Sequence, residues 1–335
     1  MNRPPEQFKR IPADQLRDFA AACLKAAGLR ADHAEQLGQL LANSDRRGVR
    51  SHGTRALGRY CAGLRDGALN PVPDLKVVKE TDVMVQVDGD GGLGYAPMML
   101  AAEMAIARAK EKGMAAGAAV HIGHYGSAGH YVRRAMEEGC TAFSVQGSHP
   151  QRFGEGGGNK GQQSAYWGNP PLCFGLPSKD EPPLILDAAT CIMADYHRGE
   201  EFDALQEMIP AAFFKSMGYT GVGIGLGGAF VGVNNGRAEE VAARWPRARQ
   251  GGLILVLDIG LFAPAEEFRT GIDHLVRGVR QTMEPVRGYD EATLPGTIEY
   301  RKEQEYGQDG VPMGLEDVQV LAEVGREFGV EPPWR

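Results

Sequence analysis

The sequence predicts an α/β protein that carries a helical unit at its N-terminal end. Up to residue 74 the apolar residues recur at helical spacing, whereas from Val77 short β-branched runs alternate with alanine-rich helical stretches. Strands and helices that alternate along a chain pack as layers of one domain. Between the two patterns stands Asn70-Pro71-Val72-Pro73, and we place the boundary there because its prolines force extended backbone.

Three helices are expected in the N-terminal unit, each beginning at a polar residue that suits a helix N-terminus. They begin at Asp14, Asp32 and Ser51. Apolar residues follow Ser51 at helical spacing, so Ser51 is predicted to cap the third helix and His52 to lie in its first turn.

The second part of the chain is predicted to alternate between strands and helices. The expected strands are residues 83–88, 115–121, 141–146, 184–187 and 253–258. The expected helices are residues 97–112, 127–138, 266–282 and 315–328, the last two being amphipathic and C-terminal. Residues 218–233 are apolar and rich in glycine, which indicates a helix packed tightly against the sheet or against a second subunit.

The composition excludes several classes of protein. With 335 residues and 43% hydrophobic content the chain can bury a large core, and its net charge of -7 argues against a nucleic-acid binder. No apolar run approaches about 20 residues and no signal-peptide pattern is present, so we expect a cytoplasmic protein without membrane contact. The five cysteines show no CxxC spacing, which favours reduced thiols over a zinc site or a disulfide framework.

The segment 45–60 has an unusual composition, because it places one histidine among five arginines. If His52 lies at a helix N-terminus, the arginines Arg50, Arg55 and Arg59 around it make a site for a carboxylate or a phosphate. A histidine there can pass a proton to the bound anion. The alternative is a solvated basic helix start with no ligand.

A second cluster of histidines lies in the segment 121–131, at a predicted strand-to-helix junction where α/β proteins place ligands. The segment contains no Asp or Glu to orient a metal ligand, so we expect no metal site. His124 with its adjacent glycines and Ser127 fits a phosphate or nicotinamide contact. A structural role stays open for His121 and His130.

Asp187 follows an apolar strand and precedes small residues. An acid at the end of a strand is placed to orient a histidine, although a helix N-cap is the simpler alternative.

Two glycine patterns match the dinucleotide-binding motif GxGxxG. The first, residues 89–94, follows a strand, but the next strand ends without the acidic residue that would bind a ribose. The second lies in an apolar segment, at Gly223, Gly225 and Gly228. We therefore interpret both as turns or close packing. A Rossmann dehydrogenase is the weaker alternative.

Taken in order, short motifs along nearly the whole chain resemble the type-2 malate/L-lactate dehydrogenase family, the NAD(P)-dependent 2-oxoacid and cyclic-imine reductases that are unrelated to the Rossmann dehydrogenases. The motifs are Arg47-Gly48, Ser51-His52-Gly53, Tyr60, Gly67, Asn70-Pro71, Val87-Asp88-Gly89, Gly92, Gly94, His124-Tyr125-Gly126, Ala128-Gly129, Tyr131, Pro177, Leu186-Asp187, Ala189-Thr190, Ile209-Pro210, Gly218-Tyr219, Gly221 and Pro295-Gly296.

The resemblance implies a fold, an assembly and an activity. It implies a three-layer α/β/α domain with a mixed, sulfolactate dehydrogenase-like sheet at residues 75–261, and a helical unit built from residues 1–74 and about 262–335. It implies an intertwined homodimer that interconverts a small 2-hydroxy acid and its 2-oxoacid, or reduces a cyclic imine carboxylate, with NAD or NADP.

The resemblance also implies roles for individual residues. His52 would donate the proton to the substrate, with Ser51 and Asp187 as relay partners and His124 at the reacting centre. The substrate carboxylate would contact Arg55, Arg59 and Tyr60. The cofactor would contact His124, Tyr125, Gly126, Ser127, Ala128, Ser178, Lys179, Thr220 and Gly221.

The chain also departs from the family pattern. The arginine that the family has four residues after the histidine is Ala56 here, and two expected lysines are Thr220 and His197. The family's GTNP motif corresponds to residues 168–171 and is altered. Fewer lysines weaken contacts to a 2′-phosphate, which favours NAD slightly over NADP. An alternative is therefore a divergent member that binds a ligand or assembles without reductase activity.

Overall fold

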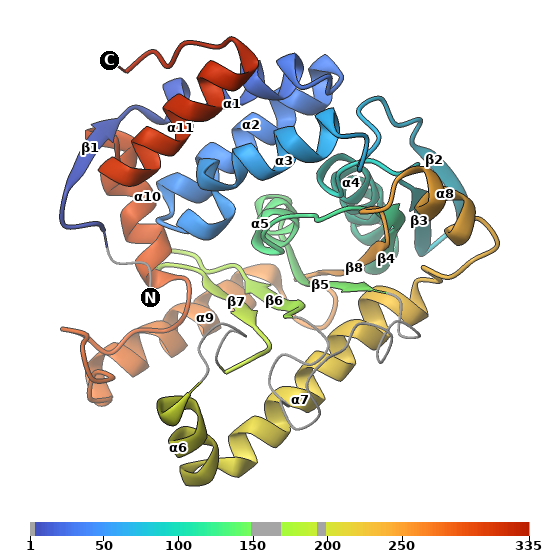
Figure 1. The fold of residues 1–335 in the computed structure, drawn as a ribbon. Helices are drawn as coiled ribbons and strands as arrows, with labels where there is room; N and C mark the ends of the chain where they lie inside the picture. Colours follow the sequence, from blue (N-terminus) through green and yellow to red (C-terminus); the bar gives the residue numbers. More distant parts are fainter. Residues whose placement is uncertain (1–3, 149–168, 193–198, 335) are drawn as a thin grey trace.

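A mixed seven-stranded sheet forms the centre of the computed structural model, which describes residues 4–148, 169–192 and 199–334 (Figure 1). The strands lie in the order β2-β3-β4-β8-β5-β6-β7, and β3 and β4 form the parallel pair among antiparallel neighbours. Their bounds are β2 Lys76–Thr81, β3 Met84–Asp88, β4 Met114–Ile122, β5 Cys140–Ser148, β6 Pro171–Leu176, β7 Leu184–Ala189 and β8 Gln250–Asp258.

Helices cover both faces of this sheet, which gives the three layers that the resemblance implied. On one face lie α4 (Tyr95–Lys112) and α5 (Gly129–Glu137), which pack on β4, β5 and β8 through fully buried side chains such as Met98 and Tyr131. On the other face lie α7 (Pro210–Ile224) and the π-helical turn η4 (Gly225–Phe230). The sheet is therefore buried most deeply around β8 and β5.

The glycine-rich stretch packs against the sheet backbone, as the sequence predicted. A Cβ atom at Gly227 would lie 2.4 Å from the backbone nitrogen of Gly147 in β5, and one at Gly228 would lie 2.1 Å from the carbonyl oxygen of Ser148. Only glycine allows so close an approach of helix and strand. The helix α7 begins earlier than predicted, because Pro210 suits the first helical position.

Both ends of the chain build the helical unit. Helices α1 (Ala13–Ala26), α2 (Ala31–Arg46) and α3 (Leu57–Arg65) share one apolar core with α11 (Leu315–Phe328) and with part of α10 (Thr297–Asp309). The short strands β1 (Phe8–Ile11) and β9 (Val311–Gly314) pair antiparallel and join the two ends (Figure 1). The exact domain boundaries stay a prediction.

The remaining helices are α6 (Glu200–Met208), α8 (Ala238–Arg244) and α9 (Ala265–Thr282). The five predicted strands are confirmed, and their ends differ from the predicted ends by at most three residues. The elements that were not predicted are β1, β2, β6, β9, α6, α8 and α10. In the described ranges every helix is too short or too polar to form a membrane span.

The prediction that Ser51 caps a helix is wrong. Two 3₁₀ turns, η1 (Arg50–His52) and η2 (Thr54–Ala56), precede α3, and Ser51 caps neither α3 nor either turn. The cause is Asp45, a buried carboxyl at the end of α2. Its Oδ2 accepts hydrogen bonds from the Thr54 backbone N–H at 2.9 Å and from the Thr54 hydroxyl at 2.7 Å. These bonds hold the loop that carries His52 against α2, so the regular helix begins later.

Candidate active site

A cavity of about 470 Å³ lies where the helical unit meets one edge of the sheet. The ends of β4, β5 and β7 and the beginning of β8 lie at this edge. Gln250, the first residue of β8, pairs with Ile122 at the end of β4 and with Ser148 at the end of β5. The lining residues are Val49, Ser51, His52, His124, Gly126, Ser127, Gln146, Gly147, Ser148, Asn169, Pro170, Pro171, Asp187, Ala189, Ile224 and Gln250. The cavity thus brings together His52 and Asp187, which are far apart in the sequence.

His52 enters the cavity from turn η1. Its Nδ1 lies 3.0 Å from the hydroxyl oxygen of Ser51, so the serine fixes one ring nitrogen and leaves Nε2 for a ligand. Burial lowers the pKa of His52 below its usual 6.5. The negative charge of Asp187 opposes this shift, whereas the positive charge of Arg59 adds to it. At neutral pH the His52 imidazole is therefore predominantly uncharged.

His124 lies directly opposite, in the loop that follows β4. Its ring stacks on that of His52 with centroids 5.8 Å apart, and its Nδ1 lies 2.8 Å from the hydroxyl oxygen of Tyr60. Burial, with smaller contributions from Arg59 and His52, lowers the pKa of His124 to about 3. His124 is consequently a neutral hydrogen-bonding group and carries no proton for transfer as an imidazolium near pH 7.

Tyr60 connects these histidines to the helical unit. Its buried hydroxyl lies 2.9 Å from the hydroxyl of Tyr95, and the guanidinium of Arg59 lies 5.2 Å from the centre of its ring. Arg59 also donates a hydrogen bond of 3.4 Å to the same hydroxyl. Arg59 thereby holds a positive charge beside the cavity.

Asp187 lies in β7 at the N-terminus of α5. Its Oδ2 accepts hydrogen bonds from the Ser127 hydroxyl at 2.5 Å and from the Gly129 backbone N–H at 3.0 Å, a position that favours a carboxylate. No hydrogen bond joins Asp187 to His52 among the described residues, so its influence on the imidazole is electrostatic across the cavity.

Gln250 is a cavity residue that the sequence analysis missed. Its side-chain oxygen is buried and has no hydrogen-bond partner in the part of the chain that the structure describes. A buried acceptor without a partner is costly, so this atom fits a donor from a ligand. A polar residue directly before the apolar run 251–257 was the available signal.

Comparison with known proteins identifies the family. Residues 11–199, more than half of the chain, match the malate/L-lactate dehydrogenase family model. The chain belongs to the malate/L-lactate dehydrogenase family. It is 26% identical over 362 residues to the malate dehydrogenase of Pyrococcus horikoshii and 27% identical over 356 residues to the L-sulfolactate dehydrogenase of Methanocaldococcus jannaschii, covering 97% of each chain in both cases. The solved structure of the Pyrococcus horikoshii enzyme superposes with a TM-score of 0.82 at 23% identity, covering 98% of both chains.

As a member of the malate/L-lactate dehydrogenase family, the protein is an oxidoreductase. The predicted catalytic residues Ser51, His52, His124 and Asp187 all line one cavity, and their catalytic roles stay a prediction. Of the residues predicted to contact the cofactor, Gly126 and Ser127 line it as well.

Several other predicted site residues of this dehydrogenase lie outside the cavity. Arg55 is 61% exposed and its guanidinium lies 3.6 Å from the carboxylate of Asp317. Thr220 is buried in α7, where its hydroxyl donates to Thr190 at 3.1 Å. The cavity lining also lacks Arg59, Tyr60, Tyr125, Ala128 and Gly221. His197 and Gly168 fall outside the described residues.

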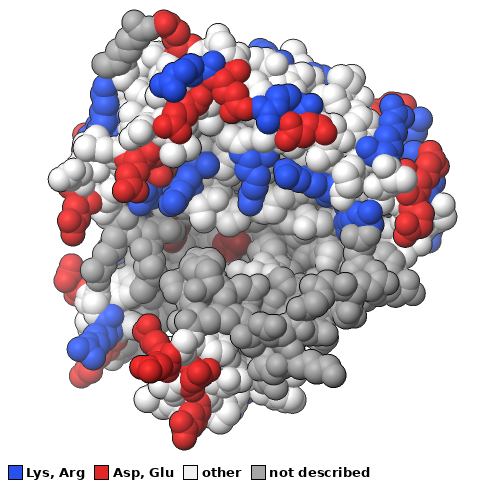
Figure 2. All heavy atoms as spheres, viewed as in Figure 1, with Lys and Arg blue, Asp and Glu red and all other residues white. Residues whose placement is uncertain are grey.

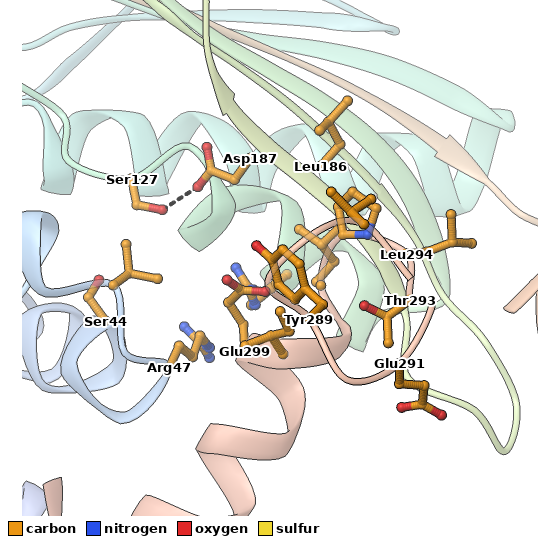
Figure 3. A pocket seen from close by; sticks show the side chains of 17 residues that line it. Ser44, Arg47, Ser127, Leu186, Asp187, Tyr289, Glu291, Thr293, Leu294 and Glu299 are labelled. Carbon is orange, nitrogen blue, oxygen red and sulfur yellow. Dashed lines mark hydrogen bonds between the residues drawn. The ribbon is translucent and has the colours of Figure 1, made fainter. Parts of the chain in front are cut away.

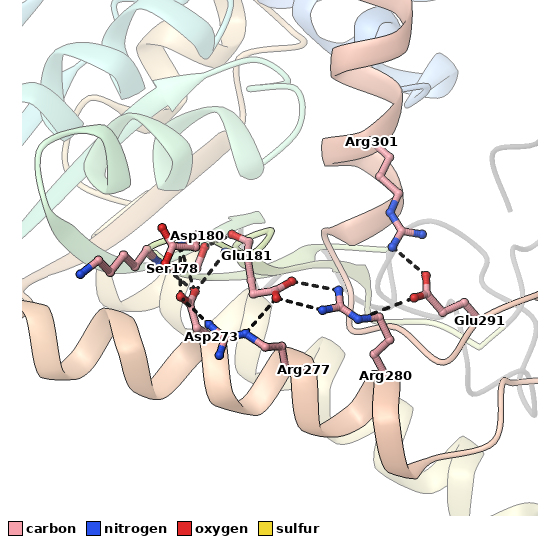
Figure 4. A network of polar contacts seen from close by, with 9 residues as sticks. Ser178, Asp180, Glu181, Asp273, Arg277, Arg280, Glu291 and Arg301 are labelled. Atoms are coloured by element: carbon pink, nitrogen blue, oxygen red, sulfur yellow. Dashed lines mark hydrogen bonds and ion pairs between the residues drawn. The ribbon is translucent and has the colours of Figure 1, made fainter.

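Ser178 and Lys179 belong to a polar network at the turn between β6 and β7 (Figure 4). The buried carboxylate of Asp273 accepts hydrogen bonds from the backbone N–H groups of Lys179, Asp180 and Glu181 at 3.0 to 3.2 Å. The Lys179 ammonium pairs with Glu266 at 3.0 Å. These contacts hold the turn against α9, and neither Ser178 nor Lys179 lines the cavity.

The surface charge around the site is uneven. Figure 2 shows Lys and Arg side chains gathered along the helical unit, above a hollow in the middle of the molecule. A basic rim of this kind raises the local concentration of anionic ligands.

Proposed function

We propose that this enzyme interconverts a small 2-hydroxy acid and its 2-oxoacid, or reduces a cyclic imine carboxylate, with NAD or NADP as the hydride carrier. The observation that carries the proposal is the shared cavity of His52, His124 and Asp187. The family match and the malate and sulfolactate dehydrogenases among the relatives support the same substrate class.

The proposed proton carrier is His52. In the oxidative direction its neutral imidazole takes the proton of the substrate hydroxyl, and in the reductive direction its imidazolium returns a proton to the carbonyl or imine. Ser51 holds Nδ1, and the carboxylate of Asp187 stabilises the charged form across the cavity. The nicotinamide, when bound, accepts or supplies the hydride.

Arg59 is the proposed partner of the substrate carboxylate. Arg59 is exposed and does not line the cavity, but its charge lowers the pKa of both histidines, whereas Arg55 is already paired with Asp317. Tyr60 positions His124 through the hydroxyl contact of 2.8 Å. The neutral His124 then offers Nε2 as a hydrogen-bonding group to the substrate oxygen.

The residues around the cavity suit a nicotinamide ring. The unpartnered oxygen of Gln250 would accept a hydrogen bond from the carboxamide NH₂ group of the nicotinamide. No Lys or Arg lines the described part of the cavity. This absence of a cation for a 2′-phosphate supports NAD over NADP.

The experiment that tests the function is cofactor oxidation with a panel of 2-oxoacids and cyclic imines. Activity with at least one substrate is expected, and His52→Ala should reduce it by about 10²- to 10⁴-fold. The matched control is His274→Ala, because His274 is exposed on α9 and does not line the cavity. Unchanged activity in His52→Ala would end the assignment of the proton carrier.

The alternative is a divergent family member that binds a ligand without reducing it. Ala56 at the usual position of an arginine favours this alternative, because Arg55 does not replace it in the cavity. Calorimetry decides between the two functions. Absence of binding of NADH and NADPH at millimolar concentration would favour the alternative.

We further propose that the enzyme is a homodimer, with α7 and η4 at the interface. Phe214 and Phe230 are 68% and 71% exposed, and Tyr219 and Val222 are more than half exposed. Apolar surface of this extent on one helical segment favours association. Analytical ultracentrifugation should find a dimer, and Phe214→Glu should shift it toward monomer. A monomeric wild-type protein would refute the proposal.

A cytoplasmic location completes the proposal. Four of the five cysteines are buried thiols, and burial raises the pKa of Cys23 and of Cys61 to about 12. Such thiols suit a reducing compartment. Fractionation of the source cells would test the location.

A further inference from the structure

The cavity loop, residues 121–127, leads from the end of β4 toward α5 and is held by a carboxylate at each end. At its C-terminal end the Ser127 hydroxyl donates to Asp187 at 2.5 Å, beside the start of α5 (Figure 3). At its N-terminal end Nδ1 of His121 lies 3.0 Å from Oδ2 of Asp88, and both of these side chains are buried. Neither residue of this second pair lines the catalytic cavity, so any effect on the reaction passes through the loop.

His121 adopts a backbone conformation that residues other than glycine rarely take. Its φ is +54°, and the register between β4 and β8 shifts between Ala119 and Ile122, so the strand is bulged at this point. A bulge bends a strand and changes the direction of the side chains that follow it. Beyond this bulge Ile122 pairs with Gln250, and both Gln250 and His124 line the cavity.

The carboxylate of Asp88 holds a second residue of this kind. Asp90 has a φ of +46°, and its backbone N–H donates to Oδ1 of Asp88 at 2.9 Å. Within the part of the chain that the structure describes, Asp90 and His121 are the two residues other than glycine with a positive φ. Arg237, which precedes α8, donates to Oδ2 of Asp88 at 2.8 Å. Unfavourable backbone conformations persist where such contacts fix them, and they are common at active sites.

Asp88 also determines which nitrogen of His121 is used. Burial raises the pKa of Asp88, but the hydrogen bonds from His121 and from the Asp90 N–H outweigh it and keep the pKa below its usual 3.8. At neutral pH Asp88 is therefore an acceptor, and Nδ1 of His121 donates to it. The buried Nε2 of His121 has no hydrogen-bond partner among the described residues. The polar contact of this side chain thus lies on its Nδ1 side.

The glycine-rich segment 89–94 supports the cavity loop through its backbone. Hydrogen bonds of 2.8 to 3.1 Å run from the N–H groups of Gly89, Gly91, Gly123 and Gly94 to the carbonyl oxygens of Val120, His121, Gly92 and His124, respectively. A Cβ atom at Gly94 would lie 2.7 Å from the Cβ of Tyr125, so glycine is needed for this approach. The contact agrees with the interpretation of this GxGxxG match as close packing.

We propose that His121 and Asp88 are positioning residues of the reaction, which fix the cavity loop so that His124 presents Nε2 to the substrate oxygen. The inference rests on the dehydrogenase function proposed above and adds two residues outside the cavity to it. Nδ1 of His124 accepts a hydrogen bond of 3.3 Å from the Gly126 N–H of the same loop and lies 2.8 Å from the Tyr60 hydroxyl. A nitrogen that accepts from a backbone N–H carries no proton, so the ring proton is on Nε2. A displaced loop would lose this selection of one tautomer.

Three substitutions of His121 separate its bond to Asp88 from its backbone conformation. His121→Asn can place its amide nitrogen where Nδ1 lies, and asparagine tolerates a positive φ. His121→Gln extends its amide to the side of Nε2, where no partner lies, and His121→Gly accepts the φ without making the bond. We expect kcat within about threefold of the wild type in His121→Asn and about 10- to 100-fold lower in the other two. The KM for the cofactor should stay unchanged in all three.

Nitrogen NMR of the His124 imidazole gives a readout that does not need turnover. The wild type and His121→Asn should show one tautomer, with the proton on Nε2. In His121→Gln the signals should shift toward the average of the two tautomers. Asp88→Asn should give a smaller shift of the same kind, because a single amide oxygen cannot accept both from His121 and from the Asp90 N–H. A loss of stability alone would not move these signals in a protein that is still folded.

The control is His274→Gln, because His274 is exposed on α9 and does not line the cavity. It should change neither kcat nor the His124 spectrum. A wild-type kcat and a wild-type His124 spectrum in His121→Gln would overturn the inference, and so would a His121→Asn protein that is unfolded or as impaired as His121→Gln. Weaker NADH binding with an unchanged His124 spectrum would also overturn it, since the loop would then serve the cofactor. The expected spectral changes without turnover of any substrate would refute the dehydrogenase function alone.

Discussion

The imidazole rings of His52 and His124 lie stacked, with their centroids 5.8 Å apart and their planes inclined by 24°. A proton on one ring disfavours a proton on the other, and His52 is one of the causes that lower the pKa of His124. The deeper burial of His124 decides which ring can be charged, since desolvation is the largest cause of its low pKa. The pair therefore carries at most one positive charge near neutral pH, and that charge belongs to His52.

The first prediction concerns the pH dependence of catalysis. Oxidation needs the neutral form of His52, and its pKa is lowered from 6.5 by burial. The value of kcat/KM for oxidation should therefore rise through this lowered pKa and be level at neutral pH. The value for reduction should fall over the same range, because it needs the protonated form. Steady-state rates in both directions across the acid and neutral range give the two profiles, and a reduction rate that rises with pH would contradict the role of His52.

The second prediction uses the two charges that act on His52 in opposite directions. Asp187 raises the pKa of His52 and Arg59 lowers it. In the pH profile of oxidation, Asp187→Asn should therefore move the rise in kcat/KM to lower pH, and Arg59→Gln should move it to higher pH. A shift of up to about one pH unit in each variant is expected. The pH titration of the His52 ring protons by NMR measures it directly. Shifts of the same sign in both variants would mean that the electrostatic assignment is wrong.

The sequence predicted five of the seven strands of the central sheet, and it singled out His52, His124 and Asp187, which line one cavity, because hydrophobic periodicity and the motifs around these residues are local. It failed at Ser51, where the buried carboxyl of Asp45 reaches Thr54 and replaces the expected helix start with 3₁₀ turns. A single contact such as that between Asp45 and Thr54 adds no periodic pattern to the sequence, so hydrophobic periodicity cannot predict it.

The arginines show the same limit. Arg55 and Arg59 are four residues apart and looked equivalent, yet Arg55 pairs with Asp317 from the other end of the chain and Arg59 lies on Tyr60. Arg133 lines a cavity and Arg134 does not, although both are neighbouring residues of one amphipathic helix. Which residue each arginine contacts depends on distant partners that no local pattern contains.

The third prediction concerns the hydroxyl of Tyr60. Tyr60→Phe removes a buried group that contacts Tyr95 at 2.9 Å and His124 at 2.8 Å. We expect a loss of about 1 to 3 kcal/mol in the free energy of unfolding, because two buried polar groups lose a partner, and a reduced kcat because His124 is no longer positioned. Urea denaturation and steady-state rates measure the two effects. Tyr300→Phe, at an exposed hydroxyl of α10, is the control and should change neither.

The fourth prediction links the loop of His52 to pH through Asp45. Burial raises the pKa of Asp45 from 3.8 to about 7, despite the two hydrogen bonds from Thr54. Between these values the folded protein holds a proton that the unfolded chain has lost. The contribution of Asp45 to stability is thus fully present below about pH 4 and declines as the pH rises to about 7, with a total on the order of 4 kcal/mol.

Asp45→Asn removes the titrating group while its side-chain oxygen can still accept from Thr54. The free energy of unfolding of this variant should therefore change less than that of the wild type between pH 4 and pH 7, the window set by the two pKa values. Urea denaturation at a series of pH values gives both curves. Parallel curves would show that Asp45 does not change its protonation in this window.

The last prediction concerns Gly126, which lines the cavity between His124 and Ser127. It has a φ of +78°, and a Cβ atom there would lie 2.3 to 2.4 Å from the hydroxyl and ring of Tyr95. Gly126→Ala therefore adds backbone strain of about 1 to 2 kcal/mol and an overpacking cost of about 1 to 3 kcal/mol. We expect a corresponding loss of stability and a lower kcat, because the displaced loop carries His124.

Gly218→Ala in α7 is the matched control, since nothing lies within 4 Å of its added Cβ and alanine is the better helix former. It should leave activity intact and stability equal or higher, and a Gly126→Ala protein that behaves in the same way would show that the tight contact with Tyr95 does not constrain the site.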